Sequence, residues 1–125
     1  VPAGEALKLI LLAAGYPVQE RTSSHWASGY FDLAVSQGLI SYDDIASLDE
    51  PVTRLFIAKL AARALNLQPD GSAHFADTSD PYVGALYNAG IVEGSYSGSQ
   101  LVYLPGNNIS RAEISAIIWR IYNLD

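Results

Sequence analysis

The sequence contains no cysteine and only two histidines, His25 and His74, among its 125 residues. Without cysteine neither a disulfide framework nor a thiolate zinc site can form, and two histidines are too few for a histidine-rich metal centre. The absence of cysteine leaves an oxidising location open, because disulfides are common but not obligatory there. We therefore predict a protein with no metal and no cofactor.

Basic residues are also scarce. Seven lysines and arginines stand against thirteen acids, for a formal net charge of −6. A general nucleic-acid-binding protein normally presents a basic face, and a membrane-surface module a polybasic segment, so both classes are disfavoured. Hydrophobic residues make up 50% of the chain and charged residues 16%, which excludes a disordered tail. The length suits one ordinary domain with a hydrophobic core.

Long apolar runs are absent, and none approaches the roughly 18 residues that span a bilayer. Residues 7–14 (LKLILLAA) have about the length of a signal-peptide core. Against that interpretation, Glu5 stands where a positive flank is expected, and no methionine precedes the segment. A repeated pattern instead assigns the segment to an amphipathic helix, and we expect the chain to be part of a larger protein.

The sequence repeats one helical pattern three times. Residues 52–67 and 109–124 both open with a β-branched residue, a hydroxyl residue and an arginine, and both end in Asn-Leu. Residues 1–14 fit the same frame, and the offsets between copies are 51 and 57 residues. Each copy has apolar residues at i, i+3, i+4, i+7 and i+8, the stripe of an amphipathic helix. The stripes are Ala6, Leu9, Ile10, Ala13 and Ala14; Ile57, Leu60, Ala61, Ala64 and Leu65; and Ile114, Ile117, Ile118, Ile121 and Tyr122.

Shorter helices are expected before the second and third long helices, over residues 26–37 and 81–89. Gly38 and Gly90 follow them and suit left-handed helix caps, and a proline at position 81 suits a first helical turn. The connections are long: residues 42–51 are acidic, while residues 93–108 are rich in Gly, Ser, Tyr and Asn and could include a short strand at 101–104 and a turn at 105–108. We therefore predict an all-α fold of tandem helix pairs around a shared core, with long loops and a truncated first pair.

These units resemble S-layer homology domains, modules that hold bacterial surface proteins on the cell wall. The family signature Ile-Thr-Arg-Ala-Glu is matched by Ile-Ser-Arg-Ala-Glu at residues 109–113 and by Val-Thr-Arg-Leu-Phe at residues 52–56. The short helix of the middle unit is bounded by His-Trp-Ala and Gly-Leu-Ile, and that of the last unit by Phe-Ala-Asp and Gly-Ile-Val-Glu-Gly. The resemblance implies a pseudo-threefold helical prism within one compact domain, made of residues 1–20, 21–68 and 69–125.

The resemblance also implies a function. Family members bind an anionic secondary cell-wall polysaccharide, commonly one carrying a pyruvate ketal, in grooves between adjacent repeats, and so tether surface or S-layer proteins outside the cell. In this chain the resemblance makes Arg54 and Arg111 the anion contacts. The chain departs from the pattern at Pro2 and Ala3, which replace the hydroxyl residue and the arginine, and at Phe56, which replaces the glutamate. At most two of three sites are therefore expected to be intact.

The position of these arginines is unusual on physical grounds. Thr53 and Ser110 are predicted to be N-caps, and Ser110 with Glu113 matches a capping box. Arg54 and Arg111 then lie in first helical turns, where the helix dipole disfavours a cation. Free backbone amides, the dipole and a guanidinium group could together bind a sugar carboxylate.

A structural role is the alternative for each of these residues. Either arginine could pair with a neighbouring acid such as Asp32 or Asp77 and brace the helices. Aromatic residues could form sugar-stacking walls of the grooves or anchor helix packing. The candidate ligand-binding residues are Thr53, Arg54, Ser110, Arg111, Trp26, Tyr30, Asp77 and Tyr82.

The alternative function is a structural or protein-interaction platform that binds no glycan. Leu7, Leu11 and Leu12 lie off the shared stripe, so we expect the first helix to be covered by another part of the parent protein or by a second copy. Trp119 and Tyr122 are expected to lie in the core or at an interface.

Catalysis and metal binding have little support in the sequence. The acidic pairs 43–44 and 49–50 lack the glycine and spacing of an EF-hand loop and suit a solvated loop, and residues 70–72 (Asp-Gly-Ser) suit a turn. His74 lies near Asp77, but no nucleophile elbow or phosphate loop accompanies it. A glycan hydrolase needs two carboxylates at a set separation, and no pair stands out. We therefore predict no enzymatic activity.

Overall fold

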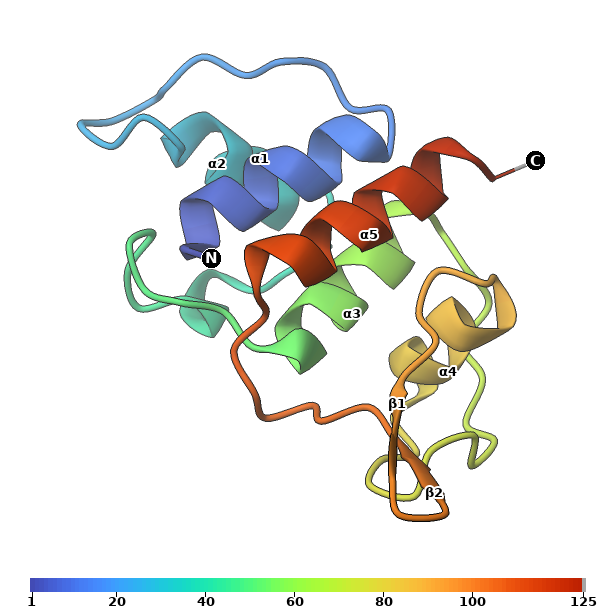
Figure 1. Ribbon diagram of the computed structural model, residues 1–125. Coiled ribbons are helices and arrows are strands. Elements are labelled where there is room, and N and C mark those ends of the chain that lie inside the picture. Colours follow the sequence, from blue (N-terminus) through green and yellow to red (C-terminus); the bar gives the residue numbers. More distant parts are fainter. Residues whose placement is uncertain (125) are drawn as a thin grey trace.

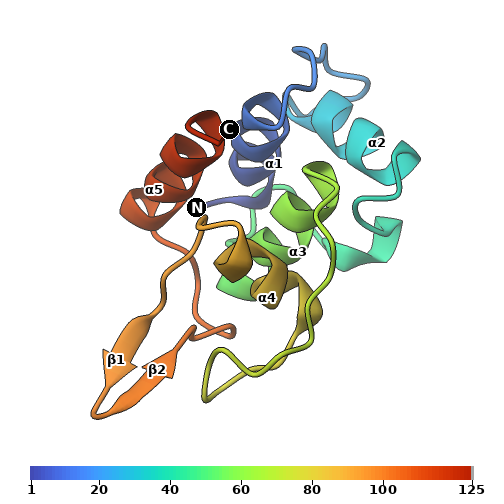
Figure 2. The ribbon, with the colours of Figure 1, turned by 90° about the vertical axis from the view of Figure 1, so that its right-hand side faces the viewer.

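The computed structural model describes residues 1–124, and helices dominate it (Figure 1). Three long helices, α1 (Ala3–Ala13), α3 (Arg54–Ala64) and α5 (Arg111–Tyr122), run side by side in the same direction. Two shorter helices lie outside them, α2 (Ser28–Ser36) against α1 and α4 (Pro81–Asn88) against α3 (Figure 2). The predicted predominance of helices is confirmed.

The predicted helix starts are confirmed at both signature motifs. The hydroxyl of Thr53 accepts a hydrogen bond from the Phe56 amide at 3.1 Å. At α5, Ser110 and Glu113 form the predicted capping box: the Ser110 hydroxyl accepts from the Glu113 amide at 3.1 Å, and the carboxylate accepts from the Ser110 amide at 3.0 Å. Each helix therefore begins with its arginine as the first helical residue.

The short helices end as predicted, but α2 begins later than expected. Gly38 and Gly90 have φ values of +72° and +77°, the left-handed conformation expected of helix caps. The predicted helix of residues 26–37 loses its first residues because the Ala27 amide donates to Nδ1 of His25 at 3.0 Å in a turn. The acidic connection after α2 contains a 3₁₀ turn, η1 (Tyr42–Asp44).

A closed ring of hydrogen bonds joins the three long helices just before their first turns. The Val52 amide donates to the Val1 carbonyl oxygen at 3.1 Å, and the Ile109 amide to the Val52 carbonyl oxygen at 3.0 Å. The Val1 nitrogen completes the ring at 3.4 Å from the Ile109 carbonyl oxygen. Because these residues hold the same place in the three copies of the pattern, equivalent points of the three helices meet in space.

Helix α1 is covered on both sides of its apolar surface. It packs against α3 and α5 and also against α2. Leu7 and Leu11 are fully buried, and Leu12 is half-buried. Gly4, on the same face as Leu7 and Leu11, approaches α2 so closely that a Cβ atom there would lie 2.8 Å from the Ala27 Cβ. The expectation that α1 needs cover from outside was therefore wrong, because α2 supplies that cover.

The long helix with an exposed apolar face is α5 instead. Trp119 holds the position that Leu11 holds in α1 and Ala62 in α3, and both equivalents are fully buried beside a short helix. Trp119 is 67% exposed and Tyr122 is 65% exposed. Of the two places expected for these aromatics, the core is excluded, because no short helix in residues 1–124 packs on α5 as α2 and α4 pack on their neighbours, and a place at an interface stays a prediction.

The long connection before α5 contains an antiparallel hairpin, β1 (Ser95–Ser97) and β2 (Gln100–Val102), which projects from the helices (Figure 2). The predicted strand at 101–104 is thus only partly correct. The chain leaves the strand after residue 102 because the Asp77 carboxylate accepts from the amides of Tyr103 and Leu104, at 2.9 and 2.8 Å. Leu104 takes a φ of +60°, and Tyr103 is buried in the core.

Candidate functional site

Arg54 is held between two helices and a loop. Its side chain is only 14% exposed and forms an ion pair with Glu113 of α5. Its Nε donates to the Tyr103 carbonyl oxygen at 2.7 Å, and its guanidinium carbon lies 4.7 Å from the Tyr103 ring centroid. Burial raises the pKa of Tyr103 to about 12, so at neutral pH the hydroxyl is protonated and donates to the Arg54 carbonyl oxygen at 2.9 Å.

Arg111 makes the equivalent ion pair with Glu5 of α1. Its side chain is 71% exposed, and the hydrogen bond to Glu5 raises the pKa of Arg111. Glu5 and Glu113 hold the same position in their helices. Each arginine therefore pairs with the glutamate position of a neighbouring long helix, and the two ion pairs brace two junctions of the three-helix core.

The acids that were expected to pair with the arginines are used elsewhere. Asp32 accepts a hydrogen bond from the Thr22 hydroxyl, and the Asp77 carboxylate binds the two backbone amides of the loop before α5. Each arginine does pair with an acid, as the structural alternative expected, but Asp32 and Asp77 were the wrong examples, because both arginines pair with a glutamate of a different unit.

Two of the departures from the signature, Ala3 and Phe56, fall at a single junction. Ala3 stands at the arginine position of α1, and Phe56 stands at the glutamate position of α3. In the other two junctions these positions form the ion pair. The α1–α3 junction therefore lacks both members of the ion pair, and neither an unpaired arginine nor an unpaired glutamate is present at these positions.

The start of α3 does not offer free backbone amides. The amides of Arg54 and Leu55 donate to the carbonyl oxygens of Asn107 and Pro105, at 2.8 and 3.0 Å. That part of the anion-site prediction was wrong for α3, because the loop before α5 passes over the helix start. At α5, the equivalent amides of Arg111 and Ala112 make no backbone hydrogen bond of this kind within residues 1–124.

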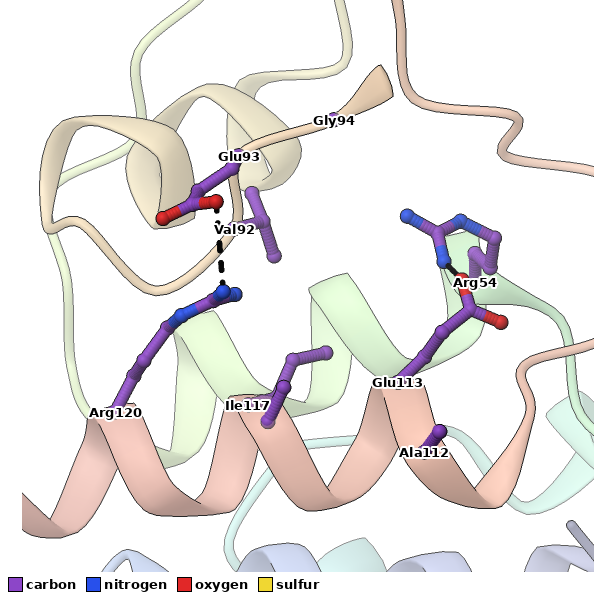
Figure 3. A pocket seen from close by; sticks show the side chains of 9 residues that line it. Arg54, Val92, Glu93, Gly94, Ala112, Glu113, Ile117 and Arg120 are labelled. Atoms are coloured by element: carbon purple, nitrogen blue, oxygen red, sulfur yellow. Dashed lines mark ion pairs between the residues drawn. The ribbon is translucent and has the colours of Figure 1, made fainter.

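A groove of about 290 Å³ lies between α5, the start of α3 and the segment after α4. Arg54 and Arg120 lie at opposite ends of it (Figure 3). Arg120 donates to the Ile91 carbonyl oxygen at 3.0 Å and lies 3.5 Å from the Glu93 carboxylate. We name this the Arg54 groove; its main lining residues are Arg54, Val92, Glu93, Gly94, Glu113 and Arg120.

A second groove, of about 300 Å³, lies between α3 and the segment after α2. Arg63 donates to the Leu39 carbonyl oxygen at 3.0 Å, just as Arg120 does to the Ile91 carbonyl oxygen. The two grooves are therefore the same place in two successive units. We name the second one the Lys59 groove; its main lining residues are Ser41, Asp44, Thr53, Phe56, Lys59 and Arg63.

The aromatic candidates lie apart from the walls of these grooves. Tyr30 is only 2% exposed, so its interpretation as a stacking wall was wrong: α2 turns the ring into the core. Trp26 is 49% exposed, with the Lys8 ammonium 5.7 Å from its ring. Tyr82 is half-buried beneath the Arg63 guanidinium, which lies 4.6 Å from the ring centroid.

Arg63 and Arg120 were missed by the sequence analysis, although a signal was available. They are 57 residues apart and follow the signature arginine by nine residues in both copies. The structure shows why the position recurs: each guanidinium binds the carbonyl oxygen that follows the glycine cap of the preceding short helix.

The loop acids serve as backbone caps and histidine partners. Asp44 accepts from the Ser41 amide at 2.8 Å. Asp49 lies 2.9 Å from Nε2 of His25. In residues 1–124 no three histidine or acidic side chains are placed to hold a metal ion.

Asp70 organises the connection between α3 and α4. Its carboxylate lies 2.8 Å from Nε2 of His74, and it also binds the Ser72 amide and the Asn88 side chain. These hydrogen bonds, first of all the one from His74, hold the pKa of Asp70 well below its usual range.

None of the helices in the described part of the chain, residues 1–124, has the length and apolar character needed to cross a bilayer.

Comparisons with known proteins agree with the resemblance seen in the signature motifs. Residues 69–114 match the family model described as the S-layer homology domain. Over 121 residues, 90% of this chain, the sequence is 26% identical to an S-layer protein of Bacillus thuringiensis subsp. finitimus and to the S-layer protein sap of Bacillus anthracis. The aligned region covers 14% of each of these proteins. The resemblance is confirmed, and these similarities indicate a cell-wall-associated, extracellular location.

Proposed function

We propose that this chain, whose residues 69–114 match the S-layer homology domain, is a non-catalytic module that binds an anionic secondary cell-wall polysaccharide. The matches to S-layer proteins support a module that anchors such proteins to the cell wall. The observation that carries the glycan proposal is the Arg54 groove, where a guanidinium group from the middle unit and one from the last unit line one hollow. A pyruvate ketal carries a carboxylate, the group that a guanidinium fork binds best.

The charges in the groove suggest how a ligand carboxylate enters. Arg120 is paired with Glu93, whose side chain is 74% exposed, and the pair is separated by 3.5 Å. Exposed ion pairs of this kind contribute about 0–1 kcal/mol, so Glu93 can move into solvent at little cost. The ligand carboxylate then takes its place on Arg120, while Arg54, held by Glu113 and Tyr103, supplies a fixed positive end.

The remaining candidate residues keep supporting roles in the proposal. Thr53 and Ser110 fix the helix starts from which Arg54 and Arg111 project. Asp77 holds the loop that presents Tyr103 to Arg54. The exposed parts of the two remaining aromatic candidates, Trp26 and Tyr82, are proposed to contact neighbouring sugars of the chain.

The net charge of −6 limits how binding is achieved. Long-range steering of an anionic polymer towards this protein is repulsive, so recognition depends on short-range hydrogen bonds inside a groove. A repetitive polysaccharide can engage several modules at once, and such multivalency multiplies a modest affinity at each site.

We also propose that residues 1–20, 21–68 and 69–125 are three units of one pseudo-threefold prism. The hydrogen-bonded ring of Val1, Val52 and Ile109 supports this arrangement. The two Arg–Glu pairs support it as well, since each joins the same two positions in a different pair of helices.

Removal of the groove cations is expected to weaken binding to the cell wall. In co-sedimentation with purified sacculi, Arg54→Met and Arg120→Met should each lower the affinity about tenfold or more, the loss expected for a charge-assisted hydrogen bond. Methionine keeps the apolar stem, and circular dichroism checks the fold. Arg21→Met, on the exposed connection after α1, is the matched control.

Sacculi stripped of their secondary polysaccharide with acid complete this test. Binding that is lost on stripping and lowered by the groove variants supports the proposal. Folded protein that does not bind intact sacculi, or that binds equally well to stripped ones, contradicts the proposal.

The exposed face of α5 favours a second function, that of a packing platform between proteins. Trp119 and Tyr122 are exposed where the equivalent residues of α1 and α3 are more covered. We expect a second copy of the chain to cover this face, giving a concentration-dependent dimer in sedimentation velocity. Trp119→Ser should shift the equilibrium to monomer, since aromatic anchors dominate interface energies, whereas Trp26→Ser should not. A wild-type chain that stays monomeric at all concentrations would contradict this second function.

A further inference from the structure

The hairpin of β1 and β2 is an addition to the last unit. Between the glycine cap of the short helix and the signature motif, the middle unit has 13 residues (39–51) and the last unit has 18 (91–108). The middle unit contains the 3₁₀ turn η1 in this connection, whereas the last unit forms the hairpin, which projects beyond the helices (Figure 2). The helix pair of the middle unit packs without a hairpin, so helix packing does not account for the one in the last unit.

Only one edge of the hairpin is open. In an antiparallel pair, opposite residues alternate between hydrogen-bonded and non-bonded pairs, and the pair next to a two-residue turn such as 98–99 is a bonded one. Tyr96 and Leu101 form the second pair from the turn, so their amides and carbonyls point away from the hairpin. On the β2 side, the Leu101 carbonyl oxygen accepts from the Ala76 amide at 2.8 Å, which closes that edge.

The edge of β1 has no partner within residues 1–124. No backbone hydrogen bond from outside the hairpin reaches residues 95–97, and all three residues are exposed, Tyr96 by 75%. Proteins usually protect an exposed edge strand with lysine, proline or a bulge. β1 contains neither lysine nor proline, and its pairing with β2 is regular. The edge can therefore accept a further strand.

The sequence of this edge is self-complementary. Residues 94–98 read Gly-Ser-Tyr-Ser-Gly, the same in both directions. Two copies of β1 that pair antiparallel about a twofold axis at Tyr96 place tyrosine opposite tyrosine and serine opposite serine. Aromatic pairs and hydroxyl pairs opposite one another stabilise antiparallel sheets, and a twofold interface needs a surface that matches itself in this way.

The charge of the chain favours the same partner. A net charge of −6 makes two copies repel each other at long range. Residues 94–110 contain no acidic or basic residue and form the longest uncharged stretch of the sequence. Two copies can therefore meet at their hairpins without placing like charges opposite each other.

We propose that the open edge of β1 is a contact between two copies of the chain, which join their hairpins into a four-stranded sheet. Tyr96 of each copy donates its amide to the Tyr96 carbonyl oxygen of the other copy, and the two rings lie on the same face of the sheet. This inference goes beyond the proposed function, since it uses no groove residue, and it is independent of the exposed face of α5. Three residues make a small and weak interface, which copies held close together on one cell wall strengthen through their effective concentration.

Pairs of single cysteines test the register, because the chain has no cysteine of its own. About the proposed axis, Ser95 of one copy lies opposite Ser97 of the other, whereas the two Ser95 positions are diagonal neighbours. Opposite Cα atoms lie about 4.5–5.5 Å apart and diagonal ones about 7–8 Å, and a disulfide spans at most about 7 Å. Oxidation of mixed Ser95→Cys and Ser97→Cys chains should therefore give the heterodimer in about fivefold excess or more over either homodimer, against about twofold for random collision.

The experiment needs a label and two controls. One chain is labelled with ¹⁵N, so that mass spectrometry separates the three dimers. Both chains carry Trp119→Ser, which removes contacts through the exposed face of α5. Ser99→Cys is the matched control, because Ser99 is also exposed but lies in the turn and not on the edge. Its mixture with Ser97→Cys should give the random ratio.

Tyr96→Pro tests the proposed hydrogen bond. The Tyr96 amide does not pair with β2, and proline is tolerated on an edge strand where the amide faces outward, so the hairpin should remain. NMR contacts between residues 95 and 102 check this. When Tyr96→Pro is added to both cysteine chains, the heterodimer excess should fall to the random ratio, whereas Tyr96→Ser, which keeps the amide, should retain part of the excess.

Three results would each overturn the contact: a random ratio in the cysteine chains that retain Tyr96, homodimers as abundant as the heterodimer, or an excess that survives Tyr96→Pro in an intact hairpin. Each of these results leaves the proposed function standing, because sacculus binding by the groove variants tests that function separately.

Discussion

Gly94→Ala should destabilise the fold by about 2–5 kcal/mol. Gly94 has a φ of +75°, and a left-handed conformation costs an L-residue about 1–2 kcal/mol. A Cβ atom there would also lie 2.4 Å from Cε1 of Phe75 and 2.8 Å from the Val102 carbonyl oxygen. Relieving such overpacking in a well-packed region costs about 1–3 kcal/mol more. Urea unfolding followed by circular dichroism measures the change.

Gly98→Ala is the matched control for this prediction. Gly98 lies in the turn of the hairpin with a φ of +62°, and a Cβ atom there would meet no other atom within 4 Å. Its substitution should therefore cost only the backbone contribution of about 1–2 kcal/mol. Equal losses in the two variants would show that the packing of Gly94 against Phe75 contributes nothing.

Leu11→Ala should cost about 2–5 kcal/mol, the range for a fully buried leucine. Leu11 is 0% exposed and lies on α1, the helix that packs against α2, α3 and α5. Because Leu11 is fully buried and α1 is packed against three other helices, little collapse can fill the space that the side chain leaves. The free energy of unfolding, measured by urea denaturation, gives the loss.

The neighbouring Leu12→Ala controls for helix propensity and composition. Leu12 is half-buried, so its truncation should cost clearly less than that of Leu11. Both substitutions put alanine, the best helix former, into the same turn. If the two variants lose the same stability, α2 does not cover α1 in the way described, and the central position of α1 is contradicted.

The long helices and their starts could be predicted from the sequence because they depend on local chemistry. The apolar period, the N-cap hydroxyls of Thr53 and Ser110 and the glycine caps each act within a few residues. The structure changes their boundaries by only a few residues.

The partners of the arginines could not be predicted in the same way. The repeat shows that Arg54 and Arg111 are equivalent, but not which helix lies next to which. The pairs with Glu113 and Glu5 depend on the order of the helices around the core. The burial of Leu7 and Leu11 against α2 was not predicted for the same reason. The sequence of one helix does not show how many other helices pack against it.

The candidate site, too, could be predicted only in part from the sequence. The sequence identified Arg54 from the signature motif, but the groove it lines also needs Arg120 and Glu93, which reach it from a helix and a loop of another unit. Tyr103 had no local signal, because its burial depends on Asp77 turning the chain after the hairpin. Contacts between residues far apart in the sequence produce no hydrophobic period or local motif from which they could be predicted.

The hydrogen-bonded ring at the helix starts also has a kinetic consequence. Its members are far apart along the chain, and the contact between Val1 and Ile109 spans 108 residues. Folding rates fall as contacting residues become more distant in sequence, because each long loop must close before its contact forms. No unit can complete its own N-terminal connections alone, so the chain should refold more slowly than an up-and-down helical bundle of similar length. During synthesis, α1 gains its full set of neighbours only after α5 has left the ribosome.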